Sequence, residues 1–508
     1  MSEPAWWQRG AIYQIYPRSF ADANGDGVGD LAGITAHLDH LEALAVEAIW
    51  LSPIFKSPMA DFGYDVSDYC DVDPVFGTLD DLDELIAACH TRGIKVVLDW
   101  VPNHSSDRHP WFEASRASRD DPKRDWYTWR DGSDGGPPND WTSVFEAVGP
   151  AWTYDERTEQ WYLHSFMAEQ PDLNWENPEV VAAMHDVLRF WMDRGVDGLR
   201  LDAIAKIAKD PLLRDHANAT RRHDEDWESI HGYLRGIRKV IDEYDDRMIV
   251  GEVALQDLHR VVGYLESGDQ LHLAHNFVFI DQDWDAETYA TSIADFERLA
   301  EETAWPAWFL GNHDNPRPAS RFNHDGLGAE RSRAILVMLY TLRGTPFIYQ
   351  GEELGLPDAH IPPDRVVDVD GRDPERAPMP WTPDAPGHGF TTGDPWLPFV
   401  DDADRLNAAS QATDPDSSLH LARALARLRA ASPETLITGG QTPFDAGAGI
   451  LAWTREGDGE RLFVAVNFTD QALPLAIDGE LVLSSAASRK AVSASLQPSE
   501  ALILRLAT

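Results

Sequence analysis

Cysteine is almost absent from this chain, since only Cys70 and Cys89 occur among its 508 residues. Two cysteines cannot build a disulfide scaffold and are typical of a reducing compartment. A single disulfide between them is the alternative. No apolar run is long enough to span a bilayer. The first residues also lack a basic region followed by an apolar stretch, so no signal peptide is expected. We therefore predict a cytoplasmic protein without a membrane partner.

Positive charge is also scarce. The chain has 43 Lys and Arg against 86 Asp and Glu, for a formal net charge of −43. A field of this sign repels nucleic acids and anionic membrane surfaces, so neither is expected as a partner. It suits a small neutral ligand better than an anionic one. Such an excess of acids can equally reflect a salty habitat, and nothing in the sequence indicates an oligomeric state.

Short apolar segments alternate with helical patterns along most of the chain. The predicted strands are 11–17, 48–54, 95–101, 198–202, 248–252, 274–279, 307–310 and 346–350. The predicted helices are 34–44, 79–92, 179–194, 229–244, 286–302, 331–342 and 418–431. Eight strands alternating with helices indicate an α/β fold, the (β/α)8 TIM barrel. An open doubly wound sheet is less consistent, because it would usually have fewer strands and a glycine-rich first turn.

Two regions depart from this alternation. Residues 103–174 combine Gly, Pro, Asp and Trp in irregular order, which predicts a loop-rich subdomain inserted into the barrel. From residue 433 onward, predicted strands at 450–454, 461–467, 479–483 and 501–506 follow one another without a long helix. That pattern is typical of a β-sandwich, so residues 433–508 are assigned to a C-terminal domain. The barrel itself then comprises residues 1–102 and 175–432.

Three of the predicted strands end in a carboxylate: Asp202, Glu252 and Asp314. The carboxyl ends of barrel strands meet at one face, so we expect these acids to converge. A cap on the following helix is the plain structural alternative for each acid taken alone. Retaining glycosidases need a carboxylate nucleophile and a carboxyl acid/base about 5 Å apart. We predict glycosidic bond chemistry, with Asp202 as nucleophile, Glu252 as acid/base and Asp314 stabilising positive charge in the transition state.

Arg200 stands two residues before Asp202, so both side chains project to the same side of their strand. We expect the guanidinium to keep the nucleophile ionised. His104 and His313 also lie at predicted strand ends, beside the candidate acids. Asp99 closes a fourth predicted strand, and together these residues make four independent helix caps a poor explanation of the pattern.

A loop near the start of the chain alternates oxygen-bearing side chains with glycine. Its candidate ligands for a hard cation are Asp22, Asn24, Asp26, the carbonyl of Val28, and Asp30. Ca²⁺ prefers such oxygen ligands. Gly33 occupies the position where an EF-hand carries glutamate, so the loop is not an EF-hand. A simple Asx/Gly loop is the alternative, and we expect a structural Ca²⁺ ion.

Together these motifs resemble the α-amylase superfamily of glycoside hydrolases, and most of all its α-glucosidase and oligo-1,6-glucosidase branch. The stretches that carry the resemblance are 11–20, 63–69, 99–104, 170–174, 198–202, Glu252 in Val-Gly-Glu-Val, 309–314 and 344–353. The resemblance covers nearly the whole chain and is weakest in the final β region.

The resemblance implies a retaining mechanism that uses the three acids in the roles given above. It also implies sugar-binding residues: His104, Arg200 and His313 at the cleavage subsite, Tyr64 as a stacking floor, Asp65 paired with Arg372 at the non-reducing end, and Phe145 and Phe166 as pocket walls. A core role for the two phenylalanines stays open. The Asp65–Arg372 pair would close the pocket, so that only a terminal glucose fits. The family also carries the oxygen-rich loop as a Ca²⁺ site.

Ala203, which follows the nucleophile, bears on the substrate. In this branch Val at that position accompanies α-1,6 preference, whereas Ala or Thr accompanies α-1,4 bonds or shorter substrates. We therefore predict a retaining, exo-acting α-glucosidase acting on maltose-like oligosaccharides and other small neutral α-glucosides, with transglucosylation as a further activity. The spacing from Asp202 to Glu252 is shorter than in typical oligo-1,6-glucosidases, which predicts a different loop at the leaving-group side.

The alternative function is a sugar isomerase or transglucosidase of the trehalose synthase, sucrose isomerase or amylosucrase type. The Arg-Leu-Asp-Arg-Asp loop typical of isomaltulose synthases is absent after Asp314, where the chain has 315–321 instead. A non-catalytic relative, such as a transporter subunit, would need a membrane anchor and would tolerate loss of the acids. All three acids are present here.

Overall fold

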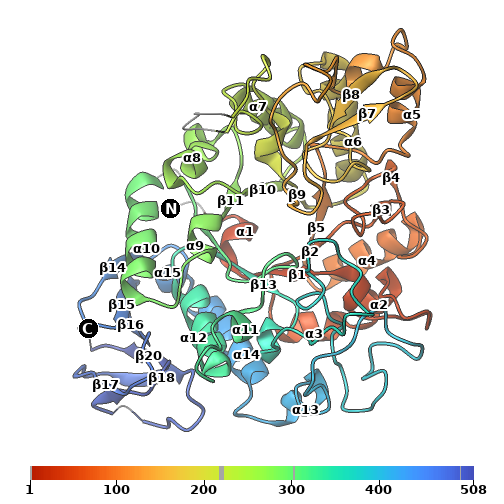
Figure 1. The fold of residues 1–508 in the computed structure, drawn as a ribbon. Coiled ribbons are helices and arrows are strands. Elements are labelled where there is room, and N and C mark those ends of the chain that lie inside the picture. The colour runs from red at the N-terminus through yellow and green to blue at the C-terminus, as the bar shows by residue number, and fades with distance from the viewer. Residues whose placement is uncertain (1–2, 217–221, 301–303, 492, 508) are drawn as a thin grey trace.

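Eight parallel strands close into a barrel in the computed structural model of the chain, which describes residues 3–216, 222–300, 304–491 and 493–507 (Figure 1). The strands are β1 (Ile12–Ile15), β2 (Ala48–Leu51), β5 (Lys95–Trp100), β9 (Gly198–Leu201), β10 (Met248–Val253), β11 (Leu273–Asn276), β12 (Ala307–Trp308) and β13 (Thr345–Tyr349). Around the barrel they follow the order β1-β13-β12-β11-β10-β9-β5-β2. The predicted TIM barrel is therefore confirmed.

Helices surround the barrel, and they include α4 (Leu79–Thr91), α6 (Pro178–Asp193), α7 (Ile230–Ile241), α8 (Leu258–Gly263), α10 (Ala286–Ala300), α12 (Gly328–Thr341) and α14 (Ser418–Ala431). Most of them bury one apolar face, whereas α12 is buried on nearly all sides. In α6 the Asn177 side chain accepts the Glu179 N–H and Pro178 occupies the first turn, a favourable start. Its buried residues Met184, Leu188 and Trp191 recur at helical spacing.

Two predicted elements differ from the structure by more than a shift of their ends. The expected helix 34–44 is two short helices, α2 (Leu31–Ala36) and α3 (Leu38–Ala43), because His37 between them has non-helical backbone angles. The expected strand 274–279 ends at Asn276, whose side chain accepts the Phe279 N–H and starts helix α9 (Phe277–Ile280). Residues 301–302 of the predicted helix 286–302 lie outside the described residues.

A small subdomain separates β5 from α6. It contains α5 (Pro110–Ala117) and a three-stranded sheet of order β6-β8-β7, with strands β6 (Trp129–Arg130), β7 (Trp152–Asp155) and β8 (Gln160–Leu163). This region forms the orange lobe at the upper right of Figure 1. Its indole groups reach the loop that follows β9, since Trp141 Nε1 donates to the Arg214 carbonyl at 2.9 Å. The subdomain and the β9 loop therefore hold one another above the carboxyl end of the barrel.

The C-terminal region is a five-stranded antiparallel sheet of order β14-β15-β16-β20-β18. Its strands are β14 (Gly440–Pro443), β15 (Ile450–Gly457), β16 (Glu460–Asn467), β18 (Glu480–Ser484) and β20 (Ala501–Arg505), and the two-stranded sheet of β17 (Leu473–Pro474) and β19 (Ser495–Leu496) lies beside it. Alternate residues face opposite sides. Ile450 packs with Leu475 and Leu496, whereas Trp453 joins the barrel core.

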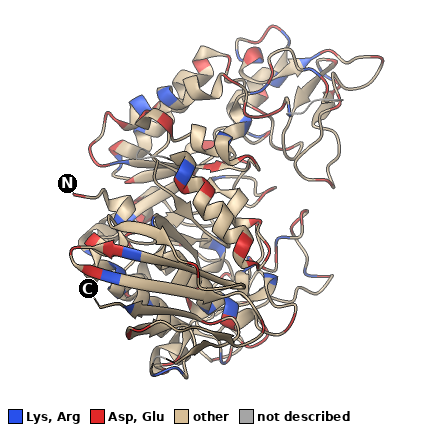
Figure 2. Ribbon diagram, turned by 90° about the vertical axis from the view of Figure 1, so that its left-hand side faces the viewer, with Lys and Arg blue, Asp and Glu red and all other residues tan. Residues whose placement is uncertain are grey.

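Acidic positions are spread over the helices and strands in view in Figure 2 and do not gather in one patch. The acidic residues behind the net charge of −43 are therefore distributed over many elements in that view. None of the described helices combines the length and apolar character needed to cross a bilayer.

Candidate active site

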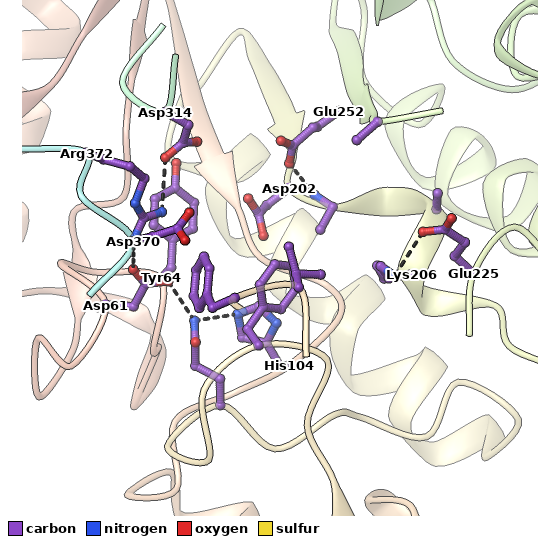
Figure 3. A pocket seen from close by; sticks show the side chains of 17 residues that line it. Asp61, Tyr64, His104, Asp202, Lys206, Glu225, Glu252, Asp314, Asp370 and Arg372 are labelled. Atoms are coloured by element: carbon purple, nitrogen blue, oxygen red, sulfur yellow. Dashed lines mark hydrogen bonds and ion pairs between the residues drawn. The ribbon is translucent and has the colours of Figure 1, made fainter. Parts of the chain in front are cut away.

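A pocket opens among the loops at the carboxyl end of the barrel strands (Figure 3). Eight of the predicted site residues line it: Tyr64, His104, Phe145, Phe166, Asp202, Glu252, Asp314 and Arg372. Arg200 and His313 are almost fully buried and contact residues of the lining from behind. The remaining predicted residue, Asp65, lies outside the lining.

One buried cation organises three carboxylates at the base of this pocket. The Arg200 side chain is 1% exposed, and its Nη1 lies 2.8 Å from Asp99 Oδ1 and 2.7 Å from Asp202 Oδ1. Its Nη2 lies 2.9 Å from Glu252 Oε2. The adjacent strands β5, β9 and β10 supply these groups, with Asp99 and Val250 in register with Arg200. The predicted nucleophile and acid/base are thus held on the two ends of a single guanidinium.

The electrostatics of Asp202 differ from the expectation based on Arg200 alone. Burial raises the pKa of Asp202 well above its ordinary value, the Arg200 charge opposes this, and the Glu252 and Asp99 charges add to the rise. Burial also raises the pKa of Asp99 to about 6. The Arg200 charge therefore acts in the expected direction, but burial outweighs it, and the pKa of Asp202 is raised rather than lowered.

The two oxygens of Glu252 have different surroundings. Oε2 accepts from Arg200 and, at 2.7 Å, from the Ala203 backbone N–H. Ala203 adopts a left-handed conformation with φ of 41°, which turns that N–H toward the carboxylate. Because donors engage Oε2, Oε1 is the oxygen available to carry a transferable proton.

A second cluster of charges lies on the opposite side of the pocket. Arg372 Nη2 lies 2.8 Å from Asp61 Oδ1 and 2.6 Å from Asp368 Oδ1, and its Nη1 lies 3.1 Å from Asp314 Oδ1. Arg376 also contacts Asp314, at 2.8 Å. Burial would raise the pKa of Asp314, but His313 and the two guanidinium groups lower it below its usual value. Asp314 is therefore anionic at neutral pH.

The predicted Asp65–Arg372 pair is wrong, and Asp61 takes that place. Asp65 is fully buried and accepts hydrogen bonds from Ser57 Oγ, at 2.8 Å, and from the backbone N–H groups of Ala60 and Asp61, both at 2.9 Å. It shapes the turn that presents Asp61 to the pocket. Both residues lie next to Gly63 and Tyr64, and sequence spacing alone did not distinguish the one that faces the ligand from the one that builds the loop.

The rings at the base and wall of the pocket contact one another. Tyr64 stacks on His313 at a centroid distance of 5.5 Å, and its hydroxyl lies 2.6 Å from His313 Nε2. Phe145 and Phe166 meet edge to face at 5.7 Å, and Arg372 lies 4.9 Å from the centre of the Phe145 ring. The two phenylalanines therefore line the pocket in addition to packing together.

Both histidines predicted to bind sugar are neutral at physiological pH. Burial lowers the pKa of His104 to about 4 and that of His313 to about 3. His104, which lines the pocket, can therefore meet a neutral hydroxyl without presenting a charge. His313 lies behind the lining, with Nδ1 2.8 Å from Gln14 Nε2 and Nε2 2.6 Å from the Tyr64 hydroxyl, so it supports the pocket from behind. Gln170 lies between this part of the pocket and the acidic cluster, because its Nε2 is 3.1 Å from His104 Nε2 and donates to Asp61 Oδ2 at 3.0 Å.

The sequence interpretation missed several residues of the lining: Asp61, Gln170, Lys206, Glu225 and Asp370. Gln170 begins the stretch 170–174, and Asp370 lies two residues before the predicted Arg372, so both lie at positions close to ones that had already been singled out. Lys206 and Glu225 lie in the loop region after β9, where no sequence motif pointed to them.

The oxygen-rich loop keeps its side chains close to its own backbone. Asp22 accepts the Gly25 and Gly27 N–H groups, and Asp30 accepts the Gly33 N–H as the cap of α2. Among the described residues, no group of three or more His, Cys, Asp or Glu side chains is arranged to hold a metal ion. A carboxylate has about four acceptor positions, however, so these bonds leave capacity for a cation. Asn and carbonyl oxygens complete a donor set of the kind Ca²⁺ takes.

Comparisons with known proteins agree over nearly the whole chain. Residues 14–439 match the family described as "Alpha amylase, catalytic domain". A "Probable alpha-glucosidase" of Rhizobium meliloti (strain 1021) is 42% identical over 502 residues, covering 92% of this chain and 90% of that protein. An "Oligo-1,6-glucosidase" of Parageobacillus thermoglucosidasius is 38% identical over 520 residues, covering 92% and 91%. The solved structure of a trehalulose synthase from Pseudomonas mesoacidophila MX-45 has a TM-score of 0.92 at 35% identity, covering 99% of this chain and all of the other.

Replacing Arg200 by Met is expected to destabilise the fold by about 3–5 kcal/mol, because three buried carboxylates lose their shared cation. Without the cation, burial raises the pKa values of Asp99 and Asp202 further, so the folded state retains protons that the unfolded state releases. The deficit should therefore grow as pH rises from 5 to 8. Denaturant unfolding at several pH values measures this. Arg235→Met, which removes a half-exposed partner of Asp269, is the matched control and should cost at most about 1 kcal/mol. Equal midpoints for the two variants would contradict the central role of Arg200.

Proposed function

The chain belongs to the α-amylase family and is a glycoside hydrolase, and on that premise we propose that it is a retaining, exo-acting α-glucosidase. The single observation that carries the proposal is the sharing of Arg200 by Asp202 and Glu252, opposite the cluster around Arg372. Its proposed substrates are short neutral oligosaccharides and other small α-glucosides. The relative from Rhizobium meliloti supports this by its name.

In the first proposed step, an Asp202 oxygen attacks the anomeric carbon while the Glu252 carboxyl transfers its proton to the departing glycosidic oxygen. Arg200 holds Asp202 Oδ1, which leaves Oδ2 for the attack. In the second step, Glu252 takes a proton from water, whose oxygen attacks the same carbon and releases Asp202. A sugar hydroxyl in place of water gives transglucosylation.

The proposed exo mode follows from the cluster at the other side of the pocket. Asp61, Asp314 and Arg372 provide charged groups that can bind several hydroxyls of one terminal glucose. Because their ion pairs join loops from three different strands, a continuing sugar chain would have to break them. Asp314 is anionic and is placed to stabilise the positive charge that develops on the ring.

The proposed linkage is α-1,4, and Ala203 is its support. The similarity to a protein named oligo-1,6-glucosidase supports α-1,6 bonds as the alternative linkage for this chain. A second candidate function is sugar isomerisation or transfer, which the likeness to the trehalulose synthase structure supports. These functions share the same first step and differ in what attacks the glucosyl–enzyme.

An NMR time course on maltose, isomaltose, sucrose and trehalose tests the proposal. We expect α-glucose to appear first, before mutarotation, with maltose turned over faster than isomaltose. Asp202→Asn and Glu252→Gln should each lower kcat by several orders of magnitude while the far-UV spectrum stays unchanged. First appearance of β-glucose would disprove retention. Isomerised products from sucrose would favour the second candidate.

Asp61 and Asp65 offer an internally controlled test of the glucose-binding cluster. Asp61→Asn should lower kcat/KM on 4-nitrophenyl α-glucoside about a hundredfold, because Arg372 and Gln170 lose a charged partner. Asp65→Asn should mainly destabilise the fold. We expect its free energy of unfolding to fall by about 1–3 kcal/mol, with a lower Tm, because the new amide group would face a backbone donor. Kinetics and thermal melts of both variants provide the comparison. A large loss of kcat/KM in Asp65→Asn, with only a loss of stability in Asp61→Asn, would instead assign ligand binding to Asp65.

We also propose that Asp22, Asn24, Asp26, Asp30 and the Val28 carbonyl hold a structural Ca²⁺ ion. When bound, the ion would stabilise the loop between β1 and α2. EDTA should then lower Tm by several degrees, and Ca²⁺ in excess, but not Mg²⁺, should restore it. In Asp26→Ala the melting temperature should no longer respond to Ca²⁺. A wild-type Tm that changes neither with EDTA nor with added Ca²⁺ would disprove the site.

A reducing, cytoplasmic location is proposed from the two cysteines. Cys70 and Cys89 are free thiols, and burial raises the pKa of Cys89 to about 12 and that of Cys70 to about 11. Neither thiol is therefore activated at neutral pH.

A further inference from the structure

The pocket has a second charged pair that the proposed mechanism leaves unused. Lys206 and Glu225 both line the cavity, and Lys206 Nζ lies 2.9 Å from Glu225 Oε2. Figure 3 shows this pair on one side of Asp202 and Glu252, with Asp61, Asp314 and Arg372 on the other. If the Arg372 side holds the glucosyl ring, as the proposed function requires, then the Lys206 side receives the group that leaves.

The position of Glu225 is fixed by its neighbours in the chain. Asp224 accepts from Lys206 Nζ at 3.0 Å and from Arg222 Nη2 at 2.7 Å. On the other side, Asp226 accepts from the Tyr264 hydroxyl at 2.6 Å, and its backbone N–H donates to the Ala205 carbonyl at 2.7 Å. Glu225 is therefore held at the cavity by the contacts of Asp224 and Asp226 as well as by its own ion pair with Lys206.

The pair also determines the charge at this side of the pocket. Among the described residues, the lining has six carboxylates (Asp61, Asp202, Glu225, Glu252, Asp314 and Asp370) and two Lys or Arg side chains. Arg372 already contacts Asp61, Asp314 and Asp368, and Lys206 already contacts Asp224 and Glu225. Within the described lining, both of these cations are thus paired with carboxylates.

We infer that Lys206 and Glu225 form the leaving-group and acceptor site, and that this site selects neutral polyhydroxylated groups and rejects anionic ones. Glu225 can accept a hydrogen bond from a sugar hydroxyl, and Lys206 can donate one. A carboxylate or phosphate on the leaving group would meet the negative field of Glu225 and Asp224. Among the described residues beside this pair, Lys206 and Arg222 are both already engaged by those two carboxylates. At close range such repulsion costs enough to change rates at least tenfold.

Maltitol and maltobionate form a matched pair of probes, because their leaving groups differ chiefly in a CH₂OH group against a carboxylate. For the wild type we expect kcat/KM to be at least tenfold lower on maltobionate. Isomaltitol and isomaltobionate serve in the same way if α-1,6 bonds prove to be preferred. α-Glucosyl fluoride provides the internal reference, because its leaving atom is too small to reach Glu225.

Glu225→Gln removes one negative charge without changing the shape of the side chain. The variant should lose about tenfold in kcat/KM on maltitol, the loss on α-glucosyl fluoride should be much smaller, and the maltitol-to-maltobionate ratio should narrow. Glu228→Gln removes an exposed charge three residues away. It should leave kcat/KM on maltitol, kcat/KM on α-glucosyl fluoride and the maltitol-to-maltobionate ratio unchanged.

Three outcomes would overturn the inference: equal wild-type rates on maltitol and maltobionate, an unchanged ratio in Glu225→Gln, or an equal loss on the fluoride, which would indicate a purely structural role. Absence of turnover on every α-glucoside, the fluoride included, would instead disprove the proposed function.

Discussion

The contact of Arg200 with three carboxylates is the interaction on which the rest of the site depends. Removing a guanidinium from water is costly, and so is burying each carboxylate. The arrangement is stable because β5, β9 and β10 are neighbours in register, so that Asp99, Arg200 and Glu252 reach one point. The barrel thus supplies the geometry, and the ion cluster in turn joins three strands. Catalytic placement and fold stability are aspects of the same contact.

Much of the fold could be predicted from the sequence because its signals are local. Apolar runs buried on both faces identify barrel strands, and regularly spaced apolar positions identify the helices outside them. Errors arose where one residue decided a boundary. Asn276 ended a strand early by capping a helix, and His37 divided one helix into two. Their roles depend on backbone angles that periodicity does not encode.

The candidate site was predictable to the extent that its residues lie at strand ends. Asp202, Glu252 and Asp314 met in the structure because parallel strands bring their carboxyl ends together. Asp61 and Glu225 were missed because they lie within long loops, where position is set by hydrogen bonds to distant groups. The pKa of Asp202 could not be predicted either, since it depends on burial and on how many carboxylates share one cation.

Arg372 and Arg376 join segments that follow three separate strands, through Asp61 after β2, Asp314 after β12 and Asp368 after β13. None of these segments can move far while the others stay in place, because each shares a cation with its neighbours. Motion at this rim is then a single cooperative event, and amide hydrogens in all three segments should exchange with one common rate. Opening or closing of these three segments together would thus control access to the glucose-binding end of the pocket.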